Sequence, residues 1–87
     1  MLIAIGGLTE LQRDMLRATL AGGGLTRARG GYVAAPGTKP FSVRTIMAMQ
    51  RMGLITFGDG TRKVALTIQG SRLLLEGKVE LPEEQAG

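Results

Sequence analysis

Cysteine and histidine are both absent from this 87-residue chain, and their absence limits how so short a chain can be stabilised. A domain of this size buries only about 60% of the surface that its unfolded chain exposes, so its stability margin is small. Disulfides and Cys/His zinc sites, the usual supports of small domains, are excluded. We therefore expect one domain that relies on an apolar core and on self-association.

The same absences narrow the range of functions. Ser-His-Asp and Cys-His catalysis both require a histidine. The carboxylates of the body are Glu10 and Asp14, on the charged face of a predicted helix, and Asp59, in a predicted turn. None of these positions suggests an enclosed acid or base. The sequence therefore predicts no enzyme, no metal site and no cofactor.

Charge is unevenly distributed along the chain. The net charge is +4, yet residues 1–72 contain ten of the eleven basic residues and three acidic ones, whereas residues 73–87 contain one lysine and four glutamates. This pattern predicts a basic domain over residues 1–77, in which residues 1–7 form a strand or an arm, and an acidic, flexible tail over residues 78–87. A basic domain favours a polyanionic partner, although a solvated basic surface is an equal alternative.

Membrane insertion is not expected. No apolar run approaches the roughly 20 residues of a membrane-spanning helix. The apolar start of the chain lacks the basic segment of a signal peptide. We therefore expect a cytoplasmic protein.

Capping residues and apolar spacing predict the first helix. Thr9 and Gln12 have the spacing of a capping box, and the glycines of residues 22–24 end the helix. Its apolar residues, from Leu11 to Leu20, cover a wide arc when placed about 100° apart. The wide arc predicts that this helix packs in the core.

A second helix is predicted over residues 42–53, with Ser42 as its N-cap. Arg44 and Arg51 lie two turns apart on one face of this helix, opposite its core-facing residues. Met47 falls on the same exposed arc, where it is a candidate for an interface. The helix therefore presents two arginines to solvent.

A hairpin and a third helix follow. Short apolar runs flank the turn residues 58–61 and predict a β-hairpin over residues 55–66. Thr67 caps a last helix, which ends at Gly77. Residues 25–40 are rich in glycine and proline, and their pattern leaves a helix, a strand or a loop open.

The order of these elements resembles the winged helix-turn-helix domain of MarR- and PadR-like bacterial regulators. There a helix ends in Gly-Leu-Ile/Val, a two-stranded wing follows, and Leu-Thr-x-x-Gly begins the next helix. Gly53-Leu54-Ile55 and Leu66-Thr67-Ile68-Gln69-Gly70 hold these places here. The resemblance covers residues 9–76 and implies an α+β fold, a small winged-helix domain of three or so helices with a two-stranded β-wing. The family also has a short helix before the recognition helix, for which residues 25–40 give no clear signal.

The resemblance implies sequence-specific binding of double-stranded DNA, with the 42–53 helix in the major groove and the 55–66 wing beside it. Arg44 is the expected guanine contact, and Arg51 is expected to reach phosphate. The implied DNA-binding residues are Arg27, Arg29, Lys39, Ser42, Arg44, Thr45, Ala48, Arg51, Arg62 and Lys63. Among those on the helix, Ser42, Arg44, Thr45 and Ala48 are expected to be exposed near its N-terminal half.

The implied protein is a small transcriptional regulator of bacterial or phage type that acts as a homodimer. The exposed apolar candidates for the dimer interface are residues 1–5 and the run Leu73–Leu75. The alternative is a winged-helix protein-interaction module, such as a small inhibitor or assembly factor, which does not bind DNA. Its basic face would then meet an acidic protein partner.

Overall fold

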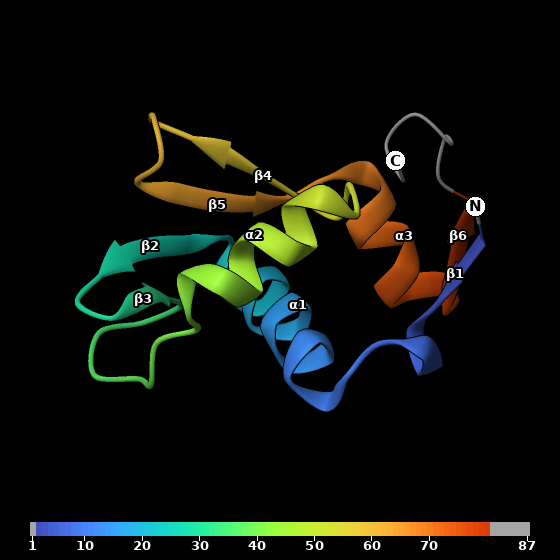
Figure 1. The fold of residues 1–87 in the computed structure, drawn as a ribbon, viewed down its shortest axis with the longest axis horizontal. Helices are drawn as coiled ribbons and strands as arrows, with labels where there is room; N and C mark the ends of the chain where they lie inside the picture. The colour runs from blue at the N-terminus through green and yellow to red at the C-terminus, as the bar shows by residue number, and fades with distance from the viewer. Residues whose placement is uncertain (1, 81–87) are drawn as a thin grey trace.

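The computed structural model describes residues 2–80, in which three α-helices and six strands form an α+β fold with two antiparallel sheets (Figure 1). In chain order the elements are β1 (Leu2–Ala4), the 3-10 helix η1 (Ile5–Gly7), α1 (Glu10–Gly22), β2 (Leu25–Ala28), β3 (Gly31–Val33), α2 (Val43–Arg51), β4 (Ile55–Gly58), β5 (Lys63–Leu66), α3 (Ile68–Glu76) and β6 (Lys78–Glu80). The predicted α+β class is thus confirmed.

The main sheet consists of two β-hairpins joined side by side, in the strand order β3-β2-β5-β4. The predicted hairpin is present as β4–β5, but β5 also pairs with β2, with Leu25 opposite Val64. Residues 25–40, for which a helix, a strand or a loop was open, form the β2–β3 hairpin and the loop that leads to α2. The β4–β5 hairpin is therefore one half of a four-stranded sheet rather than a separate two-stranded unit.

Two hydrogen bonds join β2 and β3 to the turn of the β4–β5 hairpin at one end of the molecule. The Arg27 N–H donates to the Arg62 carbonyl oxygen at 2.7 Å, and the Tyr32 hydroxyl donates to the Thr61 carbonyl oxygen at 2.5 Å. We call this part of the molecule the hairpin end. Figure 1 shows β1 and β6 at the opposite end.

The small second sheet pairs β1 with β6, with Ile3 opposite Val79. Strand β6 contains the first three residues of the segment predicted as a tail, so these residues belong to the folded domain. Met1 and the rest of the predicted tail, residues 81–87, lie outside the described residues.

The core lies between the helices and one face of the main sheet. Its buried apolar residues are Ile3, Leu8, Met15, Leu16, Leu25, Tyr32, Ile46, Met49, Leu54, Ile55, Val64, Leu73 and Val79. Side chains alternate between the two faces of a strand, so residues next to the buried ones point the other way. The opposite face of the sheet accordingly carries Thr26, Thr56, Lys63 and Ala65, which are all exposed.

Helix α1 begins with the predicted capping box. The Thr9 hydroxyl accepts from the Gln12 N–H at 3.1 Å, and the Gln12 side chain accepts from the Thr9 N–H at 3.0 Å. Only part of the apolar arc is buried, because Leu11 and Leu20 are about half exposed. The helix packs in the core as expected, but its apolar arc is wider than the surface that the sheet and α3 cover.

No helix within residues 2–80 has the length and apolar character to cross a membrane.

The two sequence motifs contact each other where α3 begins. The Thr67 hydroxyl donates to the Gly53 carbonyl oxygen at 2.6 Å and accepts from the Gly70 N–H at 3.1 Å, so Thr67 is the N-cap of α3. Gly70 is buried against Leu54, and a Cβ at position 70 would overlap the Leu54 carbonyl oxygen. This close approach needs a residue without a side chain, and it fixes α3 against the segment between α2 and β4.

Candidate nucleic-acid interface

Ser42 positions the start of α2. Its side-chain oxygen accepts from the Thr45 N–H at 3.2 Å and lies 3.0 Å from the Thr45 hydroxyl oxygen. These contacts confirm the predicted N-cap. They also tie the hydroxyls of Ser42 and Thr45 to each other at the end of the helix where base contacts were expected.

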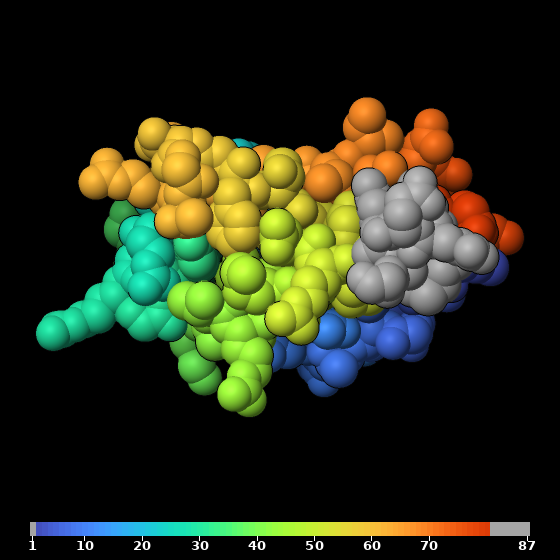
Figure 2. All heavy atoms as spheres, turned by 45° about the horizontal axis from the view of Figure 1, so that its top comes forward, coloured from blue at the N-terminus to red at the C-terminus, as the bar shows by residue number. Residues whose placement is uncertain are grey.

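The burial of α2 follows its predicted faces. Ile46 and Met49 are buried, whereas Arg44, Met47 and Arg51 are exposed. Figure 2 shows α2 at the surface beside the β4–β5 hairpin, with the β2–β3 hairpin at the same end. The two arginines therefore lie on one open face of the molecule, two turns apart.

Thr45 and Ala48 differ from the expectation of full exposure, since both are half-buried. Thr45 lies against the Ser42 cap. Ala48 has a single methyl group among the longer side chains that lie one turn away on the helix. Among the four candidates near the N-terminal half of α2, only Ser42 and Arg44 are exposed.

The loop before α2 is held against β3. The Tyr32 N–H donates to the Phe41 carbonyl oxygen at 3.0 Å, and the Phe41 N–H donates to the Tyr32 carbonyl oxygen at 2.9 Å. Gly31 permits this approach, because a Cβ there would overlap the Phe41 carbonyl oxygen. The β2–β3 hairpin therefore positions the N-terminus of α2.

Three predicted residues lie in the segments that connect elements at the hairpin end. Arg29 is in the turn between β2 and β3, Arg62 is in the turn between β4 and β5, and Lys39 is in the loop that leads to α2. All three are exposed. The Arg27 N–H, in β2, donates to the Arg62 carbonyl oxygen, and β2 pairs with β5, so the sheet holds both turns and their arginines at one end.

Arg27 and Lys63 lie on opposite faces of the main sheet. Arg27 pairs with buried Tyr32, and its guanidinium lies 5.3 Å from the centroid of the Tyr32 ring, on the face that the helices cover. Lys63 pairs with Thr26 and precedes buried Val64, so it points from the other face. The structure thus brings Arg27 toward α2 and directs Lys63 away from it.

Next to α2 is a hollow that was not foreseen from the sequence. It has a volume of about 340 Å³ and is lined by Arg27, Tyr32, Val43, Met47, Gln50, Phe57 and Thr61. The Tyr32 and Phe57 rings lie 6.1 Å apart between their centroids. The chain has only one tyrosine and two phenylalanines, and Phe41 is paired with Tyr32 through the backbone. All three aromatic residues therefore gather near the hairpin end, although nothing in their spacing predicts this.

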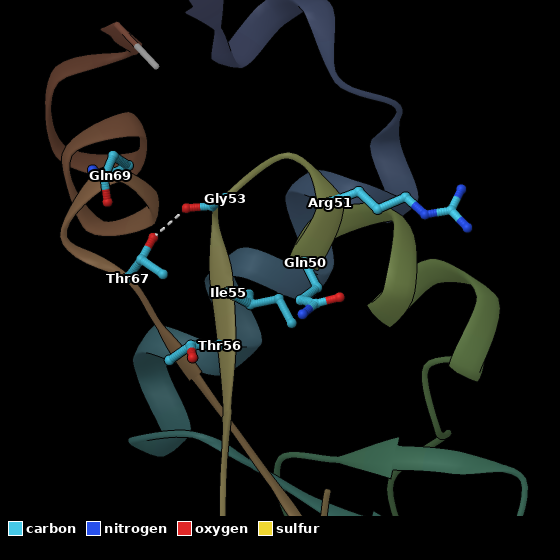
Figure 3. Close-up of a pocket in the computed structure, with 7 residues that line it drawn as sticks. All are labelled: Gln50, Arg51, Gly53, Ile55, Thr56, Thr67 and Gln69. Carbon is cyan, nitrogen blue, oxygen red and sulfur yellow. Dashed lines mark hydrogen bonds between the residues drawn. The ribbon is translucent and has the colours of Figure 1, made fainter. Parts of the chain in front are cut away.

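A second hollow, of about 310 Å³, lies between the end of α2 and the start of α3 (Figure 3). Gln50, Thr56 and Gln69 contribute much of its polar lining. Figure 3 shows the Arg51 side chain directed away from Thr67 and Gln69. This hollow therefore does not combine the arginine with the N-terminus of α3.

The charge of this region suits a polyanion. Residues 25–63 contain seven basic residues and one acidic residue, Asp59. Six of the seven basic residues lie on the exposed face of α2, on the helix-facing side of β2 or in the connecting segments of the hairpin end, and the seventh is Lys63. Guanidinium and ammonium groups gathered in this way attract phosphates. The chain matches no protein-family model, no curated protein and no solved structure.

Proposed function

We propose that the protein binds double-stranded DNA in a sequence-specific way, as a small transcriptional regulator. In this proposal α2 enters the major groove, with Arg44 contacting base edges and Arg51 contacting phosphate. Arg29, Lys39 and Arg62 contact the flanking backbone, which positions the protein on the duplex. A cytoplasmic location goes with this proposal.

One observation carries the proposal: the exposed arginines of α2 stand beside two hairpin turns that each carry an exposed arginine and that one sheet holds at the same end. An α-helix fits the major groove, and segments with basic side chains beside it can follow the backbone or the minor groove. A solvated helix needs no such neighbours. The arginines of the two turns therefore favour a binding surface over an ordinary charged face.

The β2–β3 hairpin stands where the helix-turn-helix family has its second helix. The hairpin holds the N-terminus of α2 through Tyr32 and Phe41, so α2 is supported by a strand rather than by a helix. We therefore propose two turns, one with Arg29 and one with Arg62, beside the recognition helix in place of a single wing. This arrangement lengthens the expected contact with the backbone.

Selection of bound sequences from random duplex DNA tests the proposed specificity. The proposal predicts one enriched motif, because each good pairing of an arginine with a guanine discriminates by about 1–3 kcal/mol. Recovery of DNA without any enriched motif would reduce the proposal to non-specific binding. Recovery of no DNA above background would exclude both.

A protein-interaction module is the second candidate, and the absence of a helix between α1 and α2 in the described chain favours it. Capture of partners from a nuclease-treated lysate separates the two candidates. A stoichiometric acidic protein that is retained after nuclease treatment, together with no duplex binding, supports the module. Loss of all captured partners on nuclease treatment supports DNA binding.

We propose that the protein acts as a homodimer through α3. Ile68 and Leu75 lie seven residues apart on one face of α3 and are 72% and 77% exposed. Of the candidates from the sequence, Leu73 and Ile3 are instead buried in the core. Leu75→Glu should convert the dimer to a monomer in sedimentation equilibrium, with Leu11→Glu on α1 as the matched control. A monomeric wild-type protein would contradict this proposal.

A further inference from the structure

The hollow beside α2 is formed by parts of the chain that are distant in sequence. Arg27 and Tyr32 come from β2 and β3, Val43, Met47 and Gln50 from α2, and Phe57 and Thr61 from β4 and the turn after it. Its volume of about 340 Å³ lies within the usual range of small-molecule sites, roughly 300–1,000 Å³. Met47 lines the hollow and also lies on the exposed face of α2, so the hollow opens beside the proposed DNA-binding face.

The hollow exposes apolar surface that the core does not use. Val43 begins α2, and Met47 lies one turn further along. Their side chains are 41% and 40% exposed. Phe57 is half-buried and lies next to the Tyr32 ring. These side chains form an apolar wall against which a flat, unsaturated ring can pack.

Arg27 provides a flat polar surface at the same place. Its guanidinium lies over the Tyr32 ring and donates from Nη1 to the Gly31 carbonyl oxygen at 3.2 Å. This bond and the ring restrict the orientation of the guanidinium, while the residue as a whole is exposed. A planar guanidinium held in this way can stack against a base, whereas a lysine cannot.

Two polar groups are available to contact the edge of a ring. Within residues 2–80, neither the Gln50 amide nor the Thr61 hydroxyl takes part in a hydrogen bond. An amide offers donors and an acceptor, and a hydroxyl offers both functions, so the pair can match the edge of a nucleobase.

The positive charges around the hollow favour a flat occupant that also carries negative charge. Arg27 lines it, Arg44 adjoins it on α2, and Arg62 follows Thr61 in the adjacent turn. An occupant that is flat and apolar on its faces, polar at its edge and attached to an anionic chain satisfies all of these features. We propose that the hollow binds one unpaired base of a nucleic-acid strand, so that the protein prefers DNA with an unstacked nucleotide to a fully paired duplex. This inference rests on the proposed DNA binding.

The experiment compares two DNA probes with the full chain. One is a duplex of about 20 base pairs, or two helical turns. The other is the same duplex with one additional, unpaired aminopurine, a fluorescent adenine analogue. Stacking on protein side chains contributes about 1–3 kcal/mol per base, so we expect about tenfold tighter binding of the bulged probe. Its fluorescence should also change on binding.

Two variants test the hollow directly. Arg27→Lys keeps the charge and removes the planar group, and Met47→Ala removes part of the apolar wall. With each variant, the affinity for the bulged probe should come to within about threefold of the affinity that the same variant has for the paired duplex. Leu11→Ala, at an exposed position of α1, is the control and should keep the full preference.

The outcomes separate this inference from the proposed function. Equal binding of both probes by the wild-type protein overturns the inference and leaves duplex binding intact. Binding of neither probe overturns both. Preference for the bulged probe that persists in both variants, or unchanged aminopurine fluorescence on binding, also overturns the inference.

Discussion

Gly70 shows how one residue can link two sequence motifs. Gly70 belongs to the Leu-Thr-x-x-Gly motif, and Leu54 belongs to the Gly-Leu-Ile motif. Because Gly70 has no side chain, the Leu54 carbonyl oxygen can approach it closely. Thr67 joins the same motifs through its bond to the Gly53 carbonyl oxygen. A steric constraint therefore explains why the two motifs occur together in one sequence. This explanation applies whether or not the protein binds DNA.

A methyl group at position 70 should destabilise the protein. Overpacking of a buried position costs about 1–3 kcal/mol, and in a domain of this size about 2 kcal/mol lowers Tm by about 10 °C. Thermal unfolding of Gly70→Ala, followed by circular dichroism, checks this value. Gly58→Ala is the matched control, because a Cβ there meets no atom within 4 Å. Equal Tm values for the two variants would contradict the close approach.

Arg44 should determine sequence preference, because it is the exposed arginine in the N-terminal half of α2. Arg44→Ala should reduce the preference for the selected DNA site over single-base variants by about tenfold or more. Arg51→Ala should weaken binding to all of these sequences alike. Competition binding with a set of single-base variants measures both effects. Unchanged discrimination in Arg44→Ala would exclude it as a base contact.

At the residue scale the caps could be predicted, whereas exposure could be predicted only in part. Thr9, Ser42 and Thr67 are N-caps as expected, because a cap depends on neighbours within three residues. Exposure depends on what packs against a helix from elsewhere in the chain. Leu20 and Thr45 therefore differ from the helical-wheel expectation in opposite directions.

At the scale of the elements, the sequence predicted the strand pairing between neighbouring segments but not the pairing between distant ones. The β4–β5 hairpin has turn residues between two apolar runs, and it was predicted. Strand β2 contains Arg27 and is followed by glycines, so it has no clear apolar alternation. Its pairing with β5 joins segments far apart in the chain, and a local pattern does not report such a contact. The sheet of four strands was therefore beyond prediction.

The bond from Tyr32 of β3 to Thr61 should control the mobility of the β4–β5 turn. Tyr32→Phe keeps the ring and removes the hydroxyl that donates to the Thr61 carbonyl oxygen. We expect a loss of about 1 kcal/mol and a Tm lower by about 5 °C. The Arg27 N–H donates to the carbonyl oxygen of Arg62, which lies in the same turn as Thr61. Hydrogen exchange at the Arg27 amide should therefore become faster, whereas exchange in the middle of α1 should stay unchanged. Unchanged exchange at Arg27 would show that the hydroxyl does not hold the β4–β5 turn against β2 and β3.

At the scale of the whole molecule, the basic surface and the α3 surface lie on different elements. The basic residues of positions 25–63 lie mainly at the hairpin end and on α2, whereas Leu75 and Ile68 of α3 are the most exposed large apolar side chains within residues 2–80. The uneven charge along the sequence revealed the first of these surfaces. The sequence did not reveal the hollow, because its wall combines strands and a helix that the fold alone brings together. A molecule organised in this way can bind a polyanion with one surface and a second copy with another.

The salt dependence of duplex binding tests the central claim most directly. The dissociation constant for duplex DNA should rise steeply between about 50 and 200 mM salt, since each neutralised phosphate adds about 0.9 to the slope on logarithmic axes. The double variant Arg44→Ala/Arg51→Ala should lower this slope by about one to two and weaken binding at every salt concentration. Arg17→Ala/Arg72→Ala removes the same charge from α1 and α3, where both arginines are exposed, and should leave the slope unchanged. No binding at about 50 mM salt, or equal losses in the two double variants, would contradict the claim that α2 and the hairpin end form a DNA-binding surface.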